Sequence, residues 1–525
     1  MSLRRYLVVA LALALLASAC GGSDEGSDAA AQDDEAGTGQ VDGESAAGTD
    51  DATGETGADA VAAANDEAEA AEQAADLEAL LATAPDPAEI DDRIADFLDA
   101  PNSNDGAELA LAMGVSGDTR WGPWLVDIYR LGRSTRIDNA ASAALFNLSG
   151  LVPIGQRTDD YRVFGNWVYR EGADPGDGYR RWKTELYGSI DEEFATLLDE
   201  VPDDVLLSQI QWGGVARGGI PELNDPVRLS ADAADFMTPD ELVLAVAIDG
   251  EAVAYPVRIL AHHELANDVI AGIPVSMVYC TLCRSALMFD RRVDDGTDAG
   301  ERLLDFQTSG LLIESNKIMV DVQTDTLWRH QTGVGMSGPL EGFELAQYPV
   351  LTTTWAEWLE VHPDTEVLDL PAPIFPDAAT SPEQPPIAYS YDPDDAYRFY
   401  YEDPDVWFPI FDTPDAFDLK EPMIGLLDGD EALAVQVSAL VDEGTGRVFA
   451  VGDRAVALVP GRAGARAYEV GGAGLETGPL SGTAEATDDE LTLDDGSTWP
   501  RVAVPQLFWF AWFGQQPDTA FWPEG

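Results

Sequence analysis

The second half of the sequence repeats itself, and this repeat restricts the folds that the chain can adopt. Three segments recur in the same order and at similar separations: "IPELNDP" at 220–226 with "FPIFDTP" at 408–414, "EAVAYPVRIL" at 251–260 with "EALAVQVSAL" at 431–440, and "WAEWLEVHPDT" at 355–365 with "WFAWFGQQPDT" at 509–519. Such self-similarity indicates one structural unit that occurs twice and packs against its own copy. We therefore predict copy one at 211–372 and copy two at 398–525.

Both copies are predicted to be rich in β-strands, because short β-branched runs alternate with Gly, Pro and Asp clusters. In copy one these runs are Leu242–Ile248, Val253–Leu260, Val275–Tyr279 and Ile318–Val322. Residues 87–210 differ, since apolar residues recur there at the three- and four-residue spacing of a helix. The predicted fold class is α+β: an N-terminal all-helical domain followed by a β-rich domain built from two degenerate repeats.

The N-terminus has the pattern of an export signal. Arg4 and Arg5 precede an apolar run from Leu7 to Leu16, which is too short for a stable membrane anchor. Small residues then lead to Cys20, the position at which a lipoprotein signal is cut and lipidated; ordinary signal peptidase would cut the same bond. We expect 1–20 to be a lipoprotein signal peptide and the mature protein to be extracytoplasmic, held at the cell membrane by a lipid on Cys20.

The composition of 21–86 is dominated by Ala, Gly, Asp, Glu, Ser and Thr, which predicts a disordered acidic tether. The whole chain has 29 Lys and Arg against 96 Asp and Glu, a formal net charge of -67. A charge of this sign repels phosphate backbones, so nucleic acid is not an expected partner. An unidentified protein partner that binds the helical domain remains compatible with it.

Chemistry is concentrated around Cys280 and Cys283, the only cysteines after Cys20. The strand pattern on either side places this Cys-x-x-Cys in the turn of a hairpin, as in metal knuckles, whereas a redox Cys-x-x-Cys usually begins a helix. Outside the cytoplasm the pair must bind a metal, cycle between thiols and disulfide, or form a structural disulfide. The hairpin pattern favours metal.

Two thiolates do not complete a tetrahedral metal site, so further ligands are needed. The predicted metal site consists of Cys280, Cys283, His263, Glu264 and Asp268. If 263–268 is helical, His263 shares a face with Asn267, and Glu264 shares a face with Asp268. Sulfur with imidazole suits zinc or copper. His330 is either a third ligand or an exposed side chain.

Residues 211–370 closely resemble a bacterial family that shares the domain of unknown function 3179. The resemblance rests on "GGVARGGIPELNDP", "AYPVRIL", "HELANDVIAGIPVSMVYCTLCRSALMFDR", "SGLLIESNKIMVDVQTDTLW", "GPLEG" and "TTTWAEWLEVHPDT". The family typically has Tyr-Cys-Pro-Leu-Cys-Gly, so Thr281 stands in place of the Pro and Arg284 in place of the Gly. The resemblance implies a fold and a family but no activity.

Three functional hypotheses follow from these observations. The first is an exported, lipid-anchored protein that binds zinc or copper at the Cys-x-x-Cys/His site. The second is an extracytoplasmic thiol–disulfide redox protein with Cys280 as nucleophile and His263 as base. The third is a non-catalytic surface scaffold with a structural disulfide.

Overall fold

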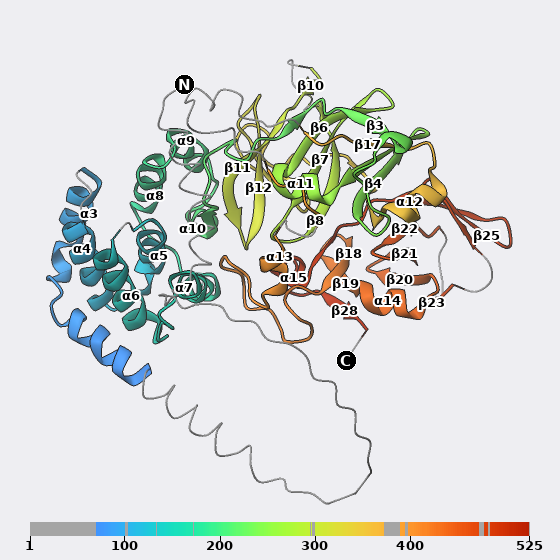
Figure 1. Ribbon diagram of the computed structural model, residues 1–525. Coiled ribbons are helices and arrows are strands. Elements are labelled where there is room, and N and C mark those ends of the chain that lie inside the picture. The colour runs from blue at the N-terminus through green and yellow to red at the C-terminus, as the bar shows by residue number, and fades with distance from the viewer. Residues whose placement is uncertain are drawn as a thin grey trace, which may run out of the picture.

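In the computed structural model, the described residues are 70–523 without 100–102, 133, 172, 295, 297–299, 372–388, 394–396, 472–476 and 481–483. A helical region lies on one side of a β-rich part that contains both copies (Figure 1). The order and type of these regions confirm the predicted α+β class.

The helical region begins with a helix over 70–81 and continues through α3 (Ile90–Asp99), α4 (Ser103–Val115), α5 (Gly122–Leu131), α6 (Thr135–Ser149), α7 (Arg157–Glu171), α8 (Tyr179–Gly188), α9 (Glu192–Asp199) and α10 (Asp204–Gln209). The first helix lies in the segment that we predicted to be a tether. It folds because Leu77 and Leu81 are buried in the helical core. Both ends of α6 are determined by local sequence, since Ser134 caps its first turn and the left-handed Gly150 ends it.

The helical region packs directly on the first sheet of copy one. This sheet A has the order β1 (Ile210–Trp212), β11 (Phe306–Ile313), β12 (Asn316–Asp321), β13 (Leu327–Arg329) and β14 (Gly335–Ser337). Leu311, Ile318 and Leu327 from this sheet belong to the same buried cluster as the helices. The helical region is therefore a covering layer of copy one and shares its core.

Copy one contains two further five-stranded sheets. Sheet B has the order β15 (Gln347–Tyr348), β8 (Ser285–Asp290), β7 (Ile273–Cys280), β6 (Leu265–Ile270) and β2 (Leu223–Asn224), and sheet C has the order β16 (Leu351–Thr354), β4 (Leu242–Ile248), β5 (Glu251–Pro256), β17 (Glu366–Leu368) and β3 (Arg228–Ser230). Two short strands, β9 (Arg292–Val293) and β10 (Arg302–Leu303), form a ribbon beside them. Helices α11 (Val257–His263) and α12 (Trp355–Val361) accompany sheet C.

Sheet B is the middle layer of copy one. Val278 and Phe289 on one face share a buried cluster with Met319 and Trp328 of sheet A. On the other face, Met277 and other residues of sheet B pack against residues of sheet C. A middle layer is apolar on both faces, and the interior strand β8 is buried along its whole length.

The described residues of copy two form two sheets and three helices. One sheet has the order β27 (Gln506–Phe508), β18 (Pro422–Asp428), β19 (Glu431–Gln436) and β28 (Ala520–Trp522), and the other has the order β23 (Gly478–Pro479), β20 (Arg447–Val451), β21 (Arg454–Pro460), β22 (Ala465–Glu469), β26 (Thr498–Val502), β25 (Glu490–Leu493) and β24 (Ala484–Ala486). The helices are α13 (Arg398–Glu402), α14 (Val437–Glu443) and α15 (Trp509–Gln515).

The two copies have matching strand orders and matching hydrogen bonds. The order β16-β4-β5-β17 in copy one corresponds to β27-β18-β19-β28 in copy two, with the same parallel and antiparallel pairings. The indole N–H of Trp358 donates to Thr365 Oγ1 at 2.9 Å, and that of Trp512 donates to Thr519 Oγ1 at 2.9 Å. The repeated Trp and Thr residues are thus core and turn elements of one shared unit.

Each copy places the turn of one hairpin against the other copy. The β7–β8 turn of copy one contacts β27, where Phe508 N donates to Cys283 O at 3.0 Å. The equivalent β21–β22 turn of copy two contacts α12, where Arg462 N donates to Glu357 Oε2 at 3.1 Å. The Cys-x-x-Cys turn therefore lies at the interface between the copies.

Candidate functional site

The two cysteines occupy one hairpin turn, as the strand pattern predicted. Cys280 is the last residue of β7 and pairs with Ser285, the first residue of β8. Arg284 closes the turn with a φ of 50°, in the left-handed region that a glycine adopts without strain. The turn is thus kept in spite of the missing glycine, and the Arg284 guanidinium lies over the rings of Tyr401 and Phe508.

Both thiols are free and buried, with 1% of Cys280 and 0% of Cys283 exposed. Burial opposes ionisation of Cys280, but hydrogen bonds from the thiol and the backbone N–H of Cys283 outweigh it and lower the pKa of Cys280. The nearby Lys317 ammonium acts in the same direction, while the Glu264 carboxylate opposes it. Burial and the adjacent sulfur of Cys280 hold the pKa of Cys283 well above its usual range. The pair therefore has one acidic and one protonated sulfur.

Lys317 and Glu264 form a buried ion pair beside the turn. Lys317 Nζ lies 3.1 Å from Glu264 Oε2 and also donates to the backbone oxygens of Glu264 and Tyr279, at 3.1 and 3.0 Å. The Glu264 carboxylate accepts from Thr281 Oγ1 at 3.2 Å and from Thr308 Oγ1 at 3.4 Å. These contacts satisfy both charges in the interior, and they place a fixed ammonium within electrostatic range of Cys280.

A second chain of contacts leads from Cys283 through Ser285 to His330. Cys283 Sγ lies 3.1 Å from Ser285 Oγ, which lies 2.5 Å from His330 Nε2. Burial and the Lys317 ammonium lower the pKa of His330 to about 3, so its imidazole is neutral at physiological pH. A neutral ring can donate from Nε2 to Ser285, whose hydroxyl proton then points at the sulfur. Of the two open expectations for His330, exposure is wrong, because none of its surface is accessible.

The structure does not bring His263 to the thiols. Both of its ring nitrogens are engaged, Nδ1 with Pro221 O at 2.8 Å and Nε2 with Tyr391 Oη at 2.7 Å. Burial lowers the pKa of His263, so the ring is held neutral between these partners. With both nitrogens in use, His263 meets neither the predicted ligand role nor the predicted role of base at Cys280 in this arrangement.

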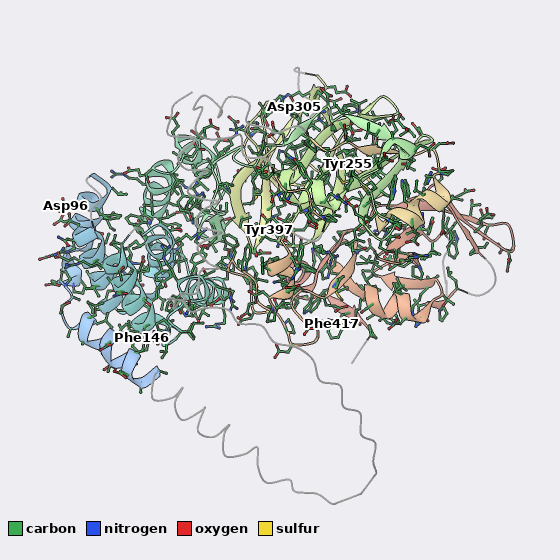
Figure 2. The ribbon with its side chains drawn as sticks, in the orientation of Figure 1. Asp96, Phe146, Tyr255, Asp305, Tyr397 and Phe417 are labelled. Carbon is green, nitrogen blue, oxygen red and sulfur yellow. The ribbon has the colours of Figure 1, made fainter. Side chains whose placement is uncertain are left out.

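The hypothesis that 263–268 is helical is wrong. Helix α11 ends at His263 because Glu264 adopts a left-handed φ of 60°, and 265–270 form strand β6. Asp268 therefore lies away from Glu264 and accepts from Arg228 Nη2 and Tyr255 Oη, each at 2.7 Å. Figure 2 shows Tyr255 among the strands of copy one.

The predicted five-residue metal set is consequently divided among separate hydrogen-bond networks. Cys280, Cys283 and Glu264 are neighbours, whereas His263 and Asp268 are bound elsewhere. Within the described part of the chain, no three His, Cys, Asp or Glu side chains gather closely enough to hold a metal ion. The predicted binding of a metal ion at Cys280, Cys283, His263, Glu264 and Asp268 stays a prediction. Cys20 lies outside the described residues, so its lipidation also stays a prediction.

Sequence reasoning missed Ser285, Lys317 and the tyrosines that contact the turn. Lys317 had a usable signal, because a lysine inside the apolar run of β12 must find a buried partner. Ser285 also had a signal, because it lies two positions after Cys283, where the chain enters the second strand of the hairpin. The tyrosines gave no local signal, since Tyr400 is 118 positions from its partner Leu282.

The fold and the site together define a two-copy β protein with a buried dithiol between its copies. Residues 217–525 match the family described as "Protein of unknown function (DUF3179)". This chain belongs to that family, and the match spans both copies. No curated protein and no solved structure matches the chain. Among the helices described, none is long and apolar enough to cross a membrane.

Proposed function

We propose that Cys280 and Cys283 are a redox pair and that the protein works by thiol–disulfide exchange. The observation that carries this proposal is the placement of two free, buried thiols in one hairpin turn, of which Cys280 is the more acidic. The more acidic thiol of such a pair attacks a disulfide, and its neighbour resolves the product. Export through the predicted signal peptide would place the pair where oxidants are present, so extracytoplasmic location is part of the proposal.

In this exchange a low-molecular-weight disulfide is the oxidant that accepts the two electrons. The Cys280 thiolate attacks one sulfur, the S–S bond of the oxidant breaks, and the first thiolate leaves and takes a proton from solvent. Cys283 then loses its proton and attacks Cys280, and the second thiol leaves. The protein gives up two electrons and two protons in all, and one disulfide becomes two thiols. A Ser285 hydroxyl aimed at Cys283 would stabilise the sulfur as its proton leaves.

A soft metal ion held by the same two sulfurs is the second candidate function. It is favoured by the turn geometry, because the backbone N–H of Cys283 points at the sulfur of Cys280 and that of Ser285 points at the sulfur of Cys283. This pattern is what a metal knuckle needs to stabilise two thiolates. Zinc or copper remain the proposed metals for this alternative, which needs further ligands in addition to the two sulfurs.

The proposed function predicts unequal behaviour of the two single variants. With an aromatic disulfide reagent, Cys283→Ser is expected to trap a stable mixed disulfide on Cys280, at least about tenfold faster than Cys280→Ser reacts at Cys283. Peptide mapping by mass spectrometry measures both rates, and wild type should release the second reagent thiol and show no trapped adduct. Equal rates in the two variants would reject the assigned roles. Reaction of wild type only after a chelator is added would favour the metal alternative.

A further inference from the structure

Three backbone carbonyl groups of the Cys-x-x-Cys turn receive hydrogen bonds from copy two. Tyr401 Oη donates to Thr281 O at 2.9 Å, Tyr400 Oη donates to Leu282 O at 2.8 Å, and Phe508 N donates to Cys283 O at 3.0 Å. These acceptors are consecutive in the chain, so copy two binds the whole turn from 281 to 283. The donors come from α13 and from β27, and they lie 118 or more positions further along the chain than the carbonyls that they bind.

Aromatic side chains of copy two complete the cover over the sulfurs. Cys280 and Cys283 share a buried cluster with Tyr400, Phe508 and Trp509, and with the next three residues of α15, 510–512. Tyr397, labelled in Figure 2, packs against this cluster and also against the core of copy one. With at most 1% of either cysteine exposed, a disulfide cannot align with the sulfurs while this contact is closed.

The contact is of a kind that can open without unfolding either copy. Apart from the shared cluster, copy two has clusters of its own, which do not include residues of copy one. The turn carbonyls and the tyrosine hydroxyls can exchange their mutual hydrogen bonds for bonds to water, so opening leaves no buried polar group without a partner.

We propose that copy two is a gate over the dithiol, and that Cys280 and Cys283 react only when α13 and β27 separate from the turn. The proposal rests on the redox function only in naming thiol–disulfide exchange as the reaction that is gated. The gate itself determines whether any reagent can reach the two sulfurs. It also gives copy two, which has no Cys or His, a task in the chemistry of copy one. The gate opens and closes faster than the thiols react, so it lowers the reaction rate in proportion to the closed fraction and keeps the reduced pair from unselective oxidation.

The test is the rate at which the reduced, full-length protein is alkylated at Cys280 and Cys283 by iodoacetamide, followed by peptide mapping. The variant Tyr400→Phe/Tyr401→Phe removes two hydroxyl donors and keeps both rings. The matched control is Tyr468→Phe, which removes a buried tyrosine hydroxyl that donates to Thr487 O at 2.5 Å inside copy two, away from the turn. We expect alkylation to be about tenfold faster in the double variant, because two hydrogen bonds no longer hold the closed state. The control should react at the wild-type rate.

An unchanged rate in the double variant would overturn the gate. An equal acceleration in Tyr468→Phe would also overturn it, since reaction would then follow general loosening of copy two. Oxidation by a small disulfide, measured in the same variants, separates the two proposals. Faster alkylation of a pair that no disulfide can oxidise would support the gate and reject the redox function.

Discussion

Replacing Lys183 with methionine is expected to lower the free energy of unfolding by about 3–5 kcal/mol. Lys183 on α8 is completely buried and lies 3.2 Å from Asp127 Oδ1. The Asp127 carboxylate also accepts from the hydroxyls of Tyr179 and Tyr187, at 2.8 and 3.0 Å. Removing the ammonium leaves the buried Asp127 carboxylate without its counter-charge. Burial already disfavours the charged carboxylate, since it raises the pKa of Asp127.

Urea unfolding followed by tryptophan fluorescence measures this loss, because Trp124 and Trp182 lie in the same helical core. The control is Arg181→Met on the same helix, which breaks an exposed pair with Glu185 and should leave the free energy of unfolding nearly unchanged. Replacing Asp127 and Lys183 together with apolar residues should recover most of the loss, since no charge is then left unpaired. A Lys183→Met variant as stable as the Arg181→Met control would show that the buried pair is not a stability element.

The variant Glu314→Gln is expected to stabilise the protein above pH 7 and to have little effect near pH 4. Glu314 lies in the β11–β12 turn, where its carboxylate accepts from Gln515 Nε2 of copy two at 2.5 Å and its backbone N–H faces Tyr169 Oη at 3.4 Å. Burial raises the pKa of Glu314 to about 7, although Arg329 opposes the shift. Through its carboxylate and its backbone N–H, Glu314 thus joins all three parts of the fold.

The sign of the pH dependence follows from proton binding. Between about pH 4.5 and pH 7, folded Glu314 holds a proton that the unfolded chain has released, so stability falls as pH rises through this window. The total loss is at most about 3 kcal/mol, and glutamine avoids it because it carries no charge. Urea unfolding at pH 5 and pH 8 checks the prediction, with the exposed Glu185→Gln as control. Parallel profiles for wild type and Glu314→Gln would contradict it.

The sequence was most informative about the repeated unit. The repeated Trp-x-x-Trp segments and the Thr residues that follow them predicted equivalent positions in two copies of one unit, and the structure gives them matching hydrogen bonds. The strand Leu242–Ile248 was predicted with its observed bounds, since its apolar run is flanked by polar turns. Local patterns are sufficient for such elements because the spacing of their apolar residues and the turns beside them determine where each one begins and ends.

The candidate site was only half predictable, because its geometry depends on contacts that are distant in the sequence. The Cys turn followed from two flanking strands, but the change from helix to strand at Glu264 depends on one left-handed residue with no glycine to indicate it. His263 was assigned to the cysteines because it is close to them in the sequence. In the folded protein its ring nitrogens form hydrogen bonds with Pro221 and Tyr391 instead. Lys317, whose ammonium helps to lower the pKa of Cys280, comes from the facing sheet A.

The most direct test of the redox proposal is the oxidation state of Cys280 and Cys283 at equilibrium in buffers with a graded ratio of oxidised to reduced dithiothreitol. Alkylation under denaturing conditions followed by peptide mapping counts the free thiols at each ratio. The proposal predicts one two-electron transition, from both cysteines alkylated to neither alkylated, that reverses when the ratio is reversed. Two thiols that stay alkylatable at every ratio, or a disulfide that no ratio reduces, would contradict it.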